Sequence, residues 1–149
     1  MDGRIDVVAT DHAPHTKEEK NNSYFKAPSG GPLVQHALVA MLDLVHDGLL
    51  PVEKVVDLMA HRVARLFRMA DRGFIRPGMK ADLVVVQPND PWTVHEGNVM
   101  SKCGWSPFKG HTFKSRVHET WVNGTQVWDG QRITTTHGHH VGERLTFAR

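Results

Sequence analysis

The first half of the chain carries one strand-like pattern and two helix-like patterns. Residues 5–10 are rich in β-branched side chains and have the length of a buried strand. A polar stretch over 11–31 follows, and a connection of this length inside a compact domain is usually functional. Apolar residues then recur every three or four positions over 33–45 and again over 52–67, which predicts two amphipathic helices.

Prolines and a glycine mark the ends of these two helices. Pro32 suits the first turn of the first helix, and Gly48 is placed to end it. Pro51 begins the second helix. We therefore expect an α/β arrangement over residues 1–70.

The second half of the chain, residues 71–149, is expected to be mostly β-structure. Residues 81–87 contain the apolar run Leu83 to Val86 and are predicted to form a strand. Two further runs, 117–122 and 125–128, flank Asn123-Gly124, and this dipeptide is the strongest short signal for a hairpin.

Composition and charge exclude several classes of partner. The 149-residue chain is 40% apolar and 23% charged, which is ordinary for a globular protein, and its net charge is +2. Its Lys and Arg residues are scattered and it has no long apolar stretch, so we expect neither nucleic acid nor a membrane as a partner. The single cysteine, Cys103, favours a cytoplasmic location, and we interpret it as a packed thiol.

An acid and two imidazoles lie where the predicted strand gives way to the long loop. Asp11, His12 and His15 come just after residue 10, and Pro14 ends regular structure there. Barrel and open-sheet enzymes keep their chemistry at this end of their strands. Because Asp11 and His15 are four residues apart across a proline turn, both side chains can face one cavity.

Several motifs follow one another in a fixed order along the chain. They are Val-Val-Ala-Thr-Asp-His-Ala-Pro-His at 7–15, Lys-Ala-Pro-Ser-Gly-Gly-Pro-Leu at 26–33, and the segments 72–86, 102–108 and 142–147. Together they resemble the dihydroorotases, a bacterial zinc-dependent family of the amidohydrolase superfamily. The resemblance runs through the whole chain and corresponds to the C-terminal third of that family's chain.

The resemblance implies a fold in two parts. Residues 1–70 would be the last strand, the substrate loop and the helices of a TIM-barrel amidohydrolase. Residues 71–149 would be the C-terminal segment of its small β-sandwich domain. In the family, earlier strands supply four metal-binding His and a carboxylated Lys, and an N-terminal segment completes the sandwich. We therefore expect this chain to expose unpaired strand edges and to form a homo-oligomer or pair with a complementary chain.

The resemblance also implies a reaction and a set of site residues. The reaction interconverts (S)-dihydroorotate and N-carbamoyl-L-aspartate in de novo pyrimidine biosynthesis, with two Zn²⁺ in a complete site. Asp11 would be a zinc ligand and the catalytic general base and acid. His15 would hold the substrate carboxylate, and the backbone of Ser29 and Gly30 would contact the substrate ring.

Each assignment has a plainer alternative. Asp11 would then only cap a turn, His15 would be a surface side chain, and Ser29 with Gly30 would simply lead into the helix. For the whole chain, the nearest enzymatic alternative is a dihydropyrimidinase- or allantoinase-like cyclic amidohydrolase. The alternative from another class is a non-catalytic fragment or pseudoenzyme subunit, because only one metal ligand is assigned.

The remaining His and Trp residues are interpreted as non-catalytic. Three His in or beside the helices are expected at a helix surface or an interface: His36, His46 and His61. Three more form a polar tract suited to adventitious metal binding: His137, His139 and His140. Three Trp are expected in the core of the β-rich part or at an interface: Trp92, Trp121 and Trp128.

Overall fold

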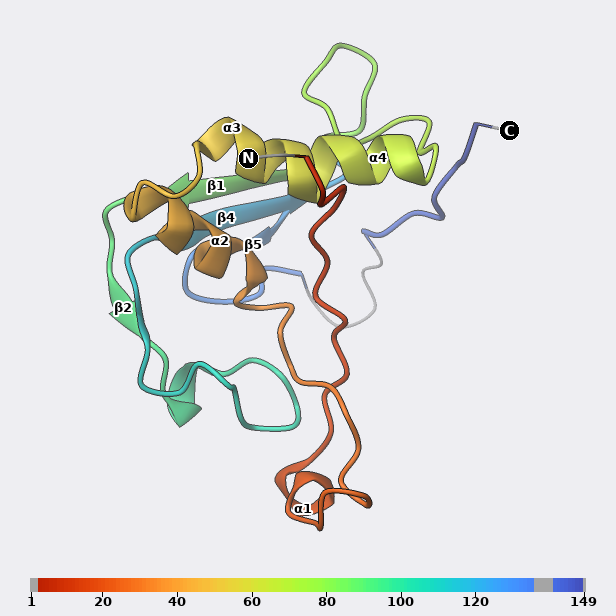
Figure 1. Ribbon diagram of the computed structural model, residues 1–149. Coiled ribbons are helices and arrows are strands. Elements are labelled where there is room, and N and C mark those ends of the chain that lie inside the picture. Colours follow the sequence, from red (N-terminus) through yellow and green to blue (C-terminus); the bar gives the residue numbers. More distant parts are fainter. Residues whose placement is uncertain (1–2, 136–140, 149) are drawn as a thin grey trace.

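Two helical segments form where the apolar spacing predicts them, in a computed structural model that describes residues 3–135 and 141–148. The first segment is α2 (Ala37–His46). The second is a continuous run of α3 (Val52–Val56), the π-helical turn η1 (Asp57–His61) and α4 (Arg62–Leu66), drawn in yellow in Figure 1. The predicted His tract at 137–140 lies outside the described residues.

The ends of α2 differ in how closely they follow the sequence. Its beginning is later than the apolar pattern indicates, because the backbone N–H groups of His36 and Ala37 both donate to the Leu33 carbonyl at 3.0 Å and form a turn. Its end is as predicted, since Gly48 follows with φ of 70°, a conformation that glycine adopts without strain.

The described residues of the β-rich part form two antiparallel sheets. The larger has the order β1 (Leu83–Gln87), β4 (Arg116–Val122) and β5 (Thr125–Trp128). The smaller pairs β2 (Trp92–Thr93) with β3 (Thr112–Phe113), and the 3-10 turn η2 (Glu96–Asn98) follows β2.

The predicted hairpin between β4 and β5 is confirmed. Asn123 and Gly124 have φ of 49° and 80°, which are the two positive values that a tight type I′ turn requires. Strand β1 is an edge strand within the described residues, and the side chains of Val84 and Val85 are exposed.

The predicted strand over residues 5–10 does not form. No regular strand lies there, and among the described residues its one hydrogen bond between backbone groups is from Val8 N–H to the Leu58 carbonyl, at 3.1 Å. A barrel strand obtains its hydrogen bonds from neighbours on both sides, and the described residues supply no such neighbour. The mixed helix and strand content is α/β as expected, whereas the division into barrel and sandwich remains a prediction.

The core lies between α2 and the small sheet. Val39, Val94 and Phe113 are fully buried, and Trp92 and Phe108 pack against them, as expected for Trp92. The prediction for His36 was wrong. Its side chain is 1% exposed rather than at a surface, because its ring stacks on Phe113 and Trp92 at centroid distances of 5.7 and 5.9 Å.

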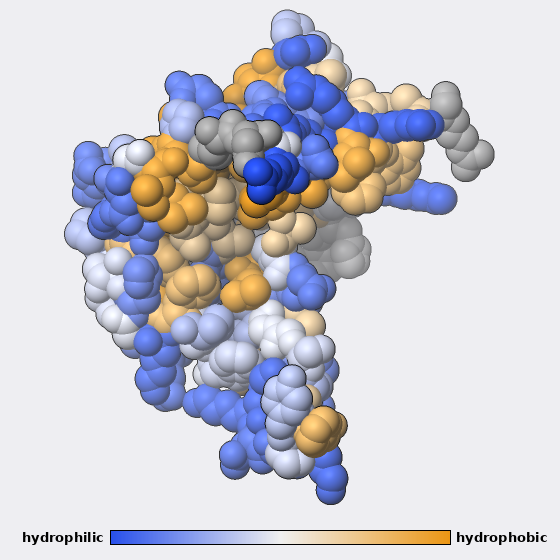
Figure 2. All heavy atoms as spheres, in the orientation of Figure 1, coloured by the Kyte–Doolittle hydropathy of each residue, from blue (hydrophilic) through white to orange (hydrophobic). Residues whose placement is uncertain are grey.

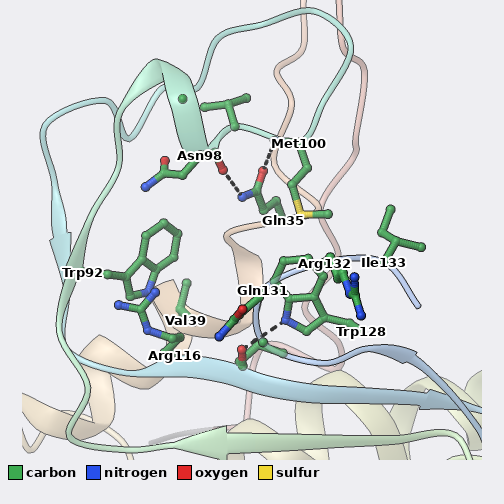
Figure 3. Close-up of a pocket in the computed structure, with 14 residues that line it drawn as sticks. Gln35, Val39, Trp92, Asn98, Met100, Arg116, Trp128, Gln131, Arg132 and Ile133 are labelled. Carbon is green, nitrogen blue, oxygen red and sulfur yellow. Dashed lines mark hydrogen bonds between the residues drawn. The ribbon is translucent and has the colours of Figure 1, made fainter. Parts of the chain in front are cut away.

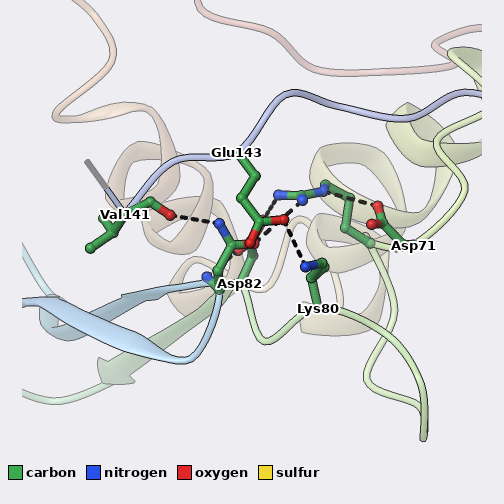
Figure 4. A network of polar contacts seen from close by, with 7 residues as sticks. Asp71, Lys80, Asp82, Val141 and Glu143 are labelled. Carbon is green, nitrogen blue, oxygen red and sulfur yellow. Dashed lines mark hydrogen bonds and ion pairs between the residues drawn. The ribbon is translucent and has the colours of Figure 1, made fainter. Parts of the chain in front are cut away.

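A buried guanidinium joins the start of the β-rich part to the hairpin (Figure 4). Arg72 binds the carboxylates of Asp71 at 3.3 Å and Asp82 at 2.5 Å. Asp82 accepts the Asn123 backbone N–H at 2.8 Å, and the Asn123 amide donates to the Val141 carbonyl at 2.6 Å. Asp71, Asp82 and Asn123 therefore meet at one positive charge, and Asn123 joins the segment at Val141 to them.

Apolar and polar residues are unevenly distributed over the face of the molecule seen in Figure 2. Figure 2 shows apolar residues gathered over α2 and the α3–α4 run, and polar residues around the projecting loop that carries α1 (Lys17–Lys20). Among the described residues, no helix is long and apolar enough to cross a membrane.

Candidate functional site

Asp11 has an unusual backbone conformation. Its φ is 43°, in the left-handed region, and its side chain is exposed. Asp is one of the few residues other than glycine that enters this region, at a cost of about 1–2 kcal/mol. A strained residue of this kind persists where the surrounding structure holds it, which occurs most often at functional sites.

The surrounding structure is a junction between two loop segments. His12 pairs with Gly31 in a parallel bridge, and its ring Nδ1 accepts the Val34 backbone N–H at 3.2 Å. The Ala13 backbone N–H donates to the Gly31 carbonyl at 3.2 Å. His12 is therefore a structural residue, and it joins the Asp11 segment to the end of the long loop.

Gly30 allows the two segments to approach closely. It has φ of 97°, and a Cβ atom at this position would lie 2.4 Å from the Ala13 Cβ. No larger residue fits there without displacing Ala13. The structure thus brings Gly30 beside the opening motif, and the roles of Ser29 and Gly30 at a substrate remain predictions.

His15 lies at the start of the projecting loop. Its Nδ1 is 3.4 Å from a carboxylate oxygen of Glu19, and Glu19 also closes a capping box with Thr16 at the start of α1. The Thr16 backbone N–H lowers the pKa of the Glu19 carboxyl, and the His15 imidazole acts in the same direction. The His15 ring is thus already paired with an acid.

Two charged contacts hold the projecting loop in place. The Lys20 ammonium donates to the carbonyls of Pro28 at 2.6 Å and Gly30 at 3.1 Å, which ties the two sides of the loop together. The Lys17 ammonium binds Glu96 of η2 at 3.0 Å. The sequence pattern gave no signal for either contact, because a Lys in a polar run indicates no particular partner.

Two cavities lie away from the predicted site. One, of about 530 Å³, is lined by Trp92, Met100 and Trp128 among others (Figure 3). Gln35, on the same lining, hydrogen-bonds to the backbone of Asn98 and Met100. The other, of about 690 Å³, lies between the helices and β1. Neither is lined by any of the four predicted site residues: Asp11, His15, Ser29 and Gly30.

The donor set for a metal ion is incomplete in this part of the protein. Residues 3–135 and 141–148 contain no group of three or more His, Cys, Asp or Glu side chains arranged to hold a metal ion. A zinc site needs three or four protein donors, so Asp11 and its neighbours do not fit a zinc ion by themselves.

The comparisons with known proteins define the class of protein. Residues 22–128 match the Amidohydrolase family, and the chain belongs to that family. It is 45% identical over 140 residues to a dihydroorotase of Halobacterium salinarum, which covers 94% of this chain and 33% of that protein. It is 39% identical over 129 residues to a dihydroorotase of Clostridioides difficile, which covers 86% of this chain and 30% of that protein.

A solved structure extends the likeness to the fold. The L-hydantoinase (dihydropyrimidinase) of Arthrobacter aurescens superposes with a TM-score of 0.87 at 28% identity, over 95% of this chain and 32% of that one. The resemblance to dihydroorotases is confirmed by the curated relatives. The chain spans about a third of the length of the curated relatives it matches.

Proposed function

We propose that this chain forms the C-terminal part of a dihydroorotase. The observation that carries the proposal is the junction at Asp11, where the complete opening motif is held against the Ser29–Gly30 segment through His12 and Gly31. The curated relatives favour dihydroorotate over the hydantoinase substrates, because their identity to this chain reaches 45% against 28% for the hydantoinase structure.

The residues of this chain have separate tasks in that reaction. The zinc ions of a complete site would supply an activated hydroxide and polarise the amide carbonyl. Asp11 accepts the proton of the attacking hydroxide and passes it to the leaving nitrogen. His15 donates N–H to the substrate carboxylate, and the backbone of Ser29 and Gly30 contacts the ring. The further metal donors must come from outside the described residues.

The second candidate is a subunit without catalytic activity. The incomplete donor set among residues 3–135 and 141–148 favours it. The two candidates differ in whether Asp11 has to be a carboxylate, since packing alone requires only its shape.

A grafting experiment distinguishes the catalytic from the non-catalytic candidate. In the graft, this chain replaces the matching third of the Clostridioides difficile dihydroorotase, and the ring opening of dihydroorotate is followed by absorbance. We expect the graft to be active and Asp11→Asn to lower its rate by about 10²- to 10⁴-fold, because the proton acceptor is lost. Asp6→Asn, which makes the same chemical change five residues earlier, is the matched control and should retain activity.

Metal content and folding are measured on each variant. A folded, metal-loaded graft without activity would favour the non-catalytic subunit. If the unchanged graft is active, near-normal turnover in Asp11→Asn would remove Asp11 from the reaction.

A further inference from the structure

The indole of Trp105 lies between the two halves of the candidate site. Its Nε1–H donates to the His15 carbonyl at 2.7 Å, across 90 positions of sequence. On its other side, the ring carbon Cη2 is 3.9 Å from the position that a Cβ of Gly31 would occupy. One side chain therefore binds the segment that carries His15 and lies beside the segment that follows Ser29 and Gly30.

The segment that carries Trp105 is fixed to the core. The next residue, Ser106, is 6% exposed, and its hydroxyl accepts the Phe108 backbone N–H at 3.1 Å and lies 3.3 Å from Nδ1 of His36. The His36 ring is itself buried among aromatic rings, and burial lowers its pKa. The Cys103 thiol contacts the Trp105 carbonyl at 3.7 Å. Trp105 is thus presented from a rigid base.

We propose that Trp105 is a positioning residue that sets the place of His15 in the substrate-binding loop. This proposal rests on the proposed function for its chemical consequence, but the contact itself is independent of it. A second long-range contact of the loop, Lys17 with Glu96, is between side chains that are more than half exposed. Exposed ion pairs hold a loop weakly, whereas the half-buried indole hydrogen bond excludes water from one side.

The expected effect follows from the atoms involved. Trp105→Phe keeps an aromatic ring against Gly31 but removes the N–H donor, so the His15 carbonyl loses its partner. The His15 imidazole then occupies a wider range of positions, while Asp11 remains held through His12 and Gly31. Substrate binding should weaken without an equal loss in the chemical step.

Two measurements test the proposal. In the present chain, hydrogen exchange of backbone amides over residues 12–20 should become faster in Trp105→Phe. In the graft, KM for dihydroorotate should rise by about 3- to 10-fold, as expected for one hydrogen bond, with kcat changed less than 2-fold. Trp128→Phe is the matched control, because its indole also donates to a backbone carbonyl, that of Val117 at 3.3 Å, away from the loop.

The possible outcomes are distinguishable. Unchanged exchange in Trp105→Phe, or equal changes in both Trp variants, would overturn the proposal. A fall in kcat at constant KM would show a general loss of folded enzyme, and the positioning role would be rejected. If the unchanged graft is inactive, the proposed function fails, and the exchange measurement still decides whether Trp105 holds the loop.

Discussion

At the scale of the residue, backbone conformation determines how the opening motif meets the long loop. Asp11 and Gly30 both have positive φ, and they lie on the two segments that His12 and Gly31 join. The sequence indicated a need for glycine at position 30, but not its cause. That cause is the Ala13 side chain, which is 17 positions away.

Replacing Gly30 should therefore cost more than the backbone strain alone. Gly30→Ala forces a non-glycine residue into the left-handed region, at about 1–2 kcal/mol, and adds a clash with Ala13 worth about 1–3 kcal/mol. Denaturant unfolding of the purified chain measures the total.

Gly78→Ala is the matched control for this experiment. Gly78 has φ of 84°, and a Cβ there would meet no atom within 4 Å, so only the backbone strain applies. Equal losses in the free energy of unfolding for the two variants would show that the close approach at Ala13 does not contribute to stability.

At the scale of the element, the sequence predicted what local chemistry determines. The hairpin at Asn123-Gly124 formed as expected, because the turn requires two positive φ values that these two residues supply. The strand over 5–10 did not form, because a strand is completed by neighbours. His36 was misplaced for a related reason, since the rings that bury it come from positions 92 to 113. The contact of Trp105 with His15 leaves no periodic signal at all.

The contact between α1 and η2 should depend on pH. The Lys109 ammonium, together with that of Lys17, lowers the pKa of Glu96 to about 2. A carboxyl group whose pKa is lowered by folding stabilises the fold above its unfolded pKa, near 4.5, and loses this contribution as pH falls towards 2. The stability difference between the unchanged chain and Glu96→Gln should be present at pH 6 and vanish near pH 2.

Thermal unfolding midpoints across this pH range measure that difference. Glu53→Gln, on α3, is the control and should show no such change over the same window. A difference between the chain and Glu96→Gln that is constant from pH 6 to pH 2 would contradict the assigned ion pairs.

At the scale of the whole molecule, this chain alone should have no dihydroorotase activity. Only Asp11 is assigned as a metal ligand, and one carboxylate does not retain zinc against water. The open site would also admit water, which weakens any electrostatic catalysis. The purified 149-residue chain is assayed with added zinc and dihydroorotate. Activity that follows the protein and disappears in Asp11→Ala would contradict this prediction.

The exposed edge of β1 bears on whether the purified chain associates with other copies of itself. Val84 and Val85 are 48% and 44% exposed on a strand without a neighbour on one side, within the described part of the chain. Unpaired apolar edges pair with other chains, which agrees with the predicted homo-oligomer. Whether the copies associate in this way remains a prediction.

The guanidinium of Arg72 has a consequence for natural variation. Its partners Asp71 and Asp82 lie on the segment that leads into β1, and Asn123 joins Asp82 to the tail at Val141. Loss of the arginine alone would leave two acids facing each other at the base of the sheet. In homologues in which this arginine is replaced, the acid at position 82 should therefore be replaced as well. Positions 72 and 82 should thus covary among descendants of this gene.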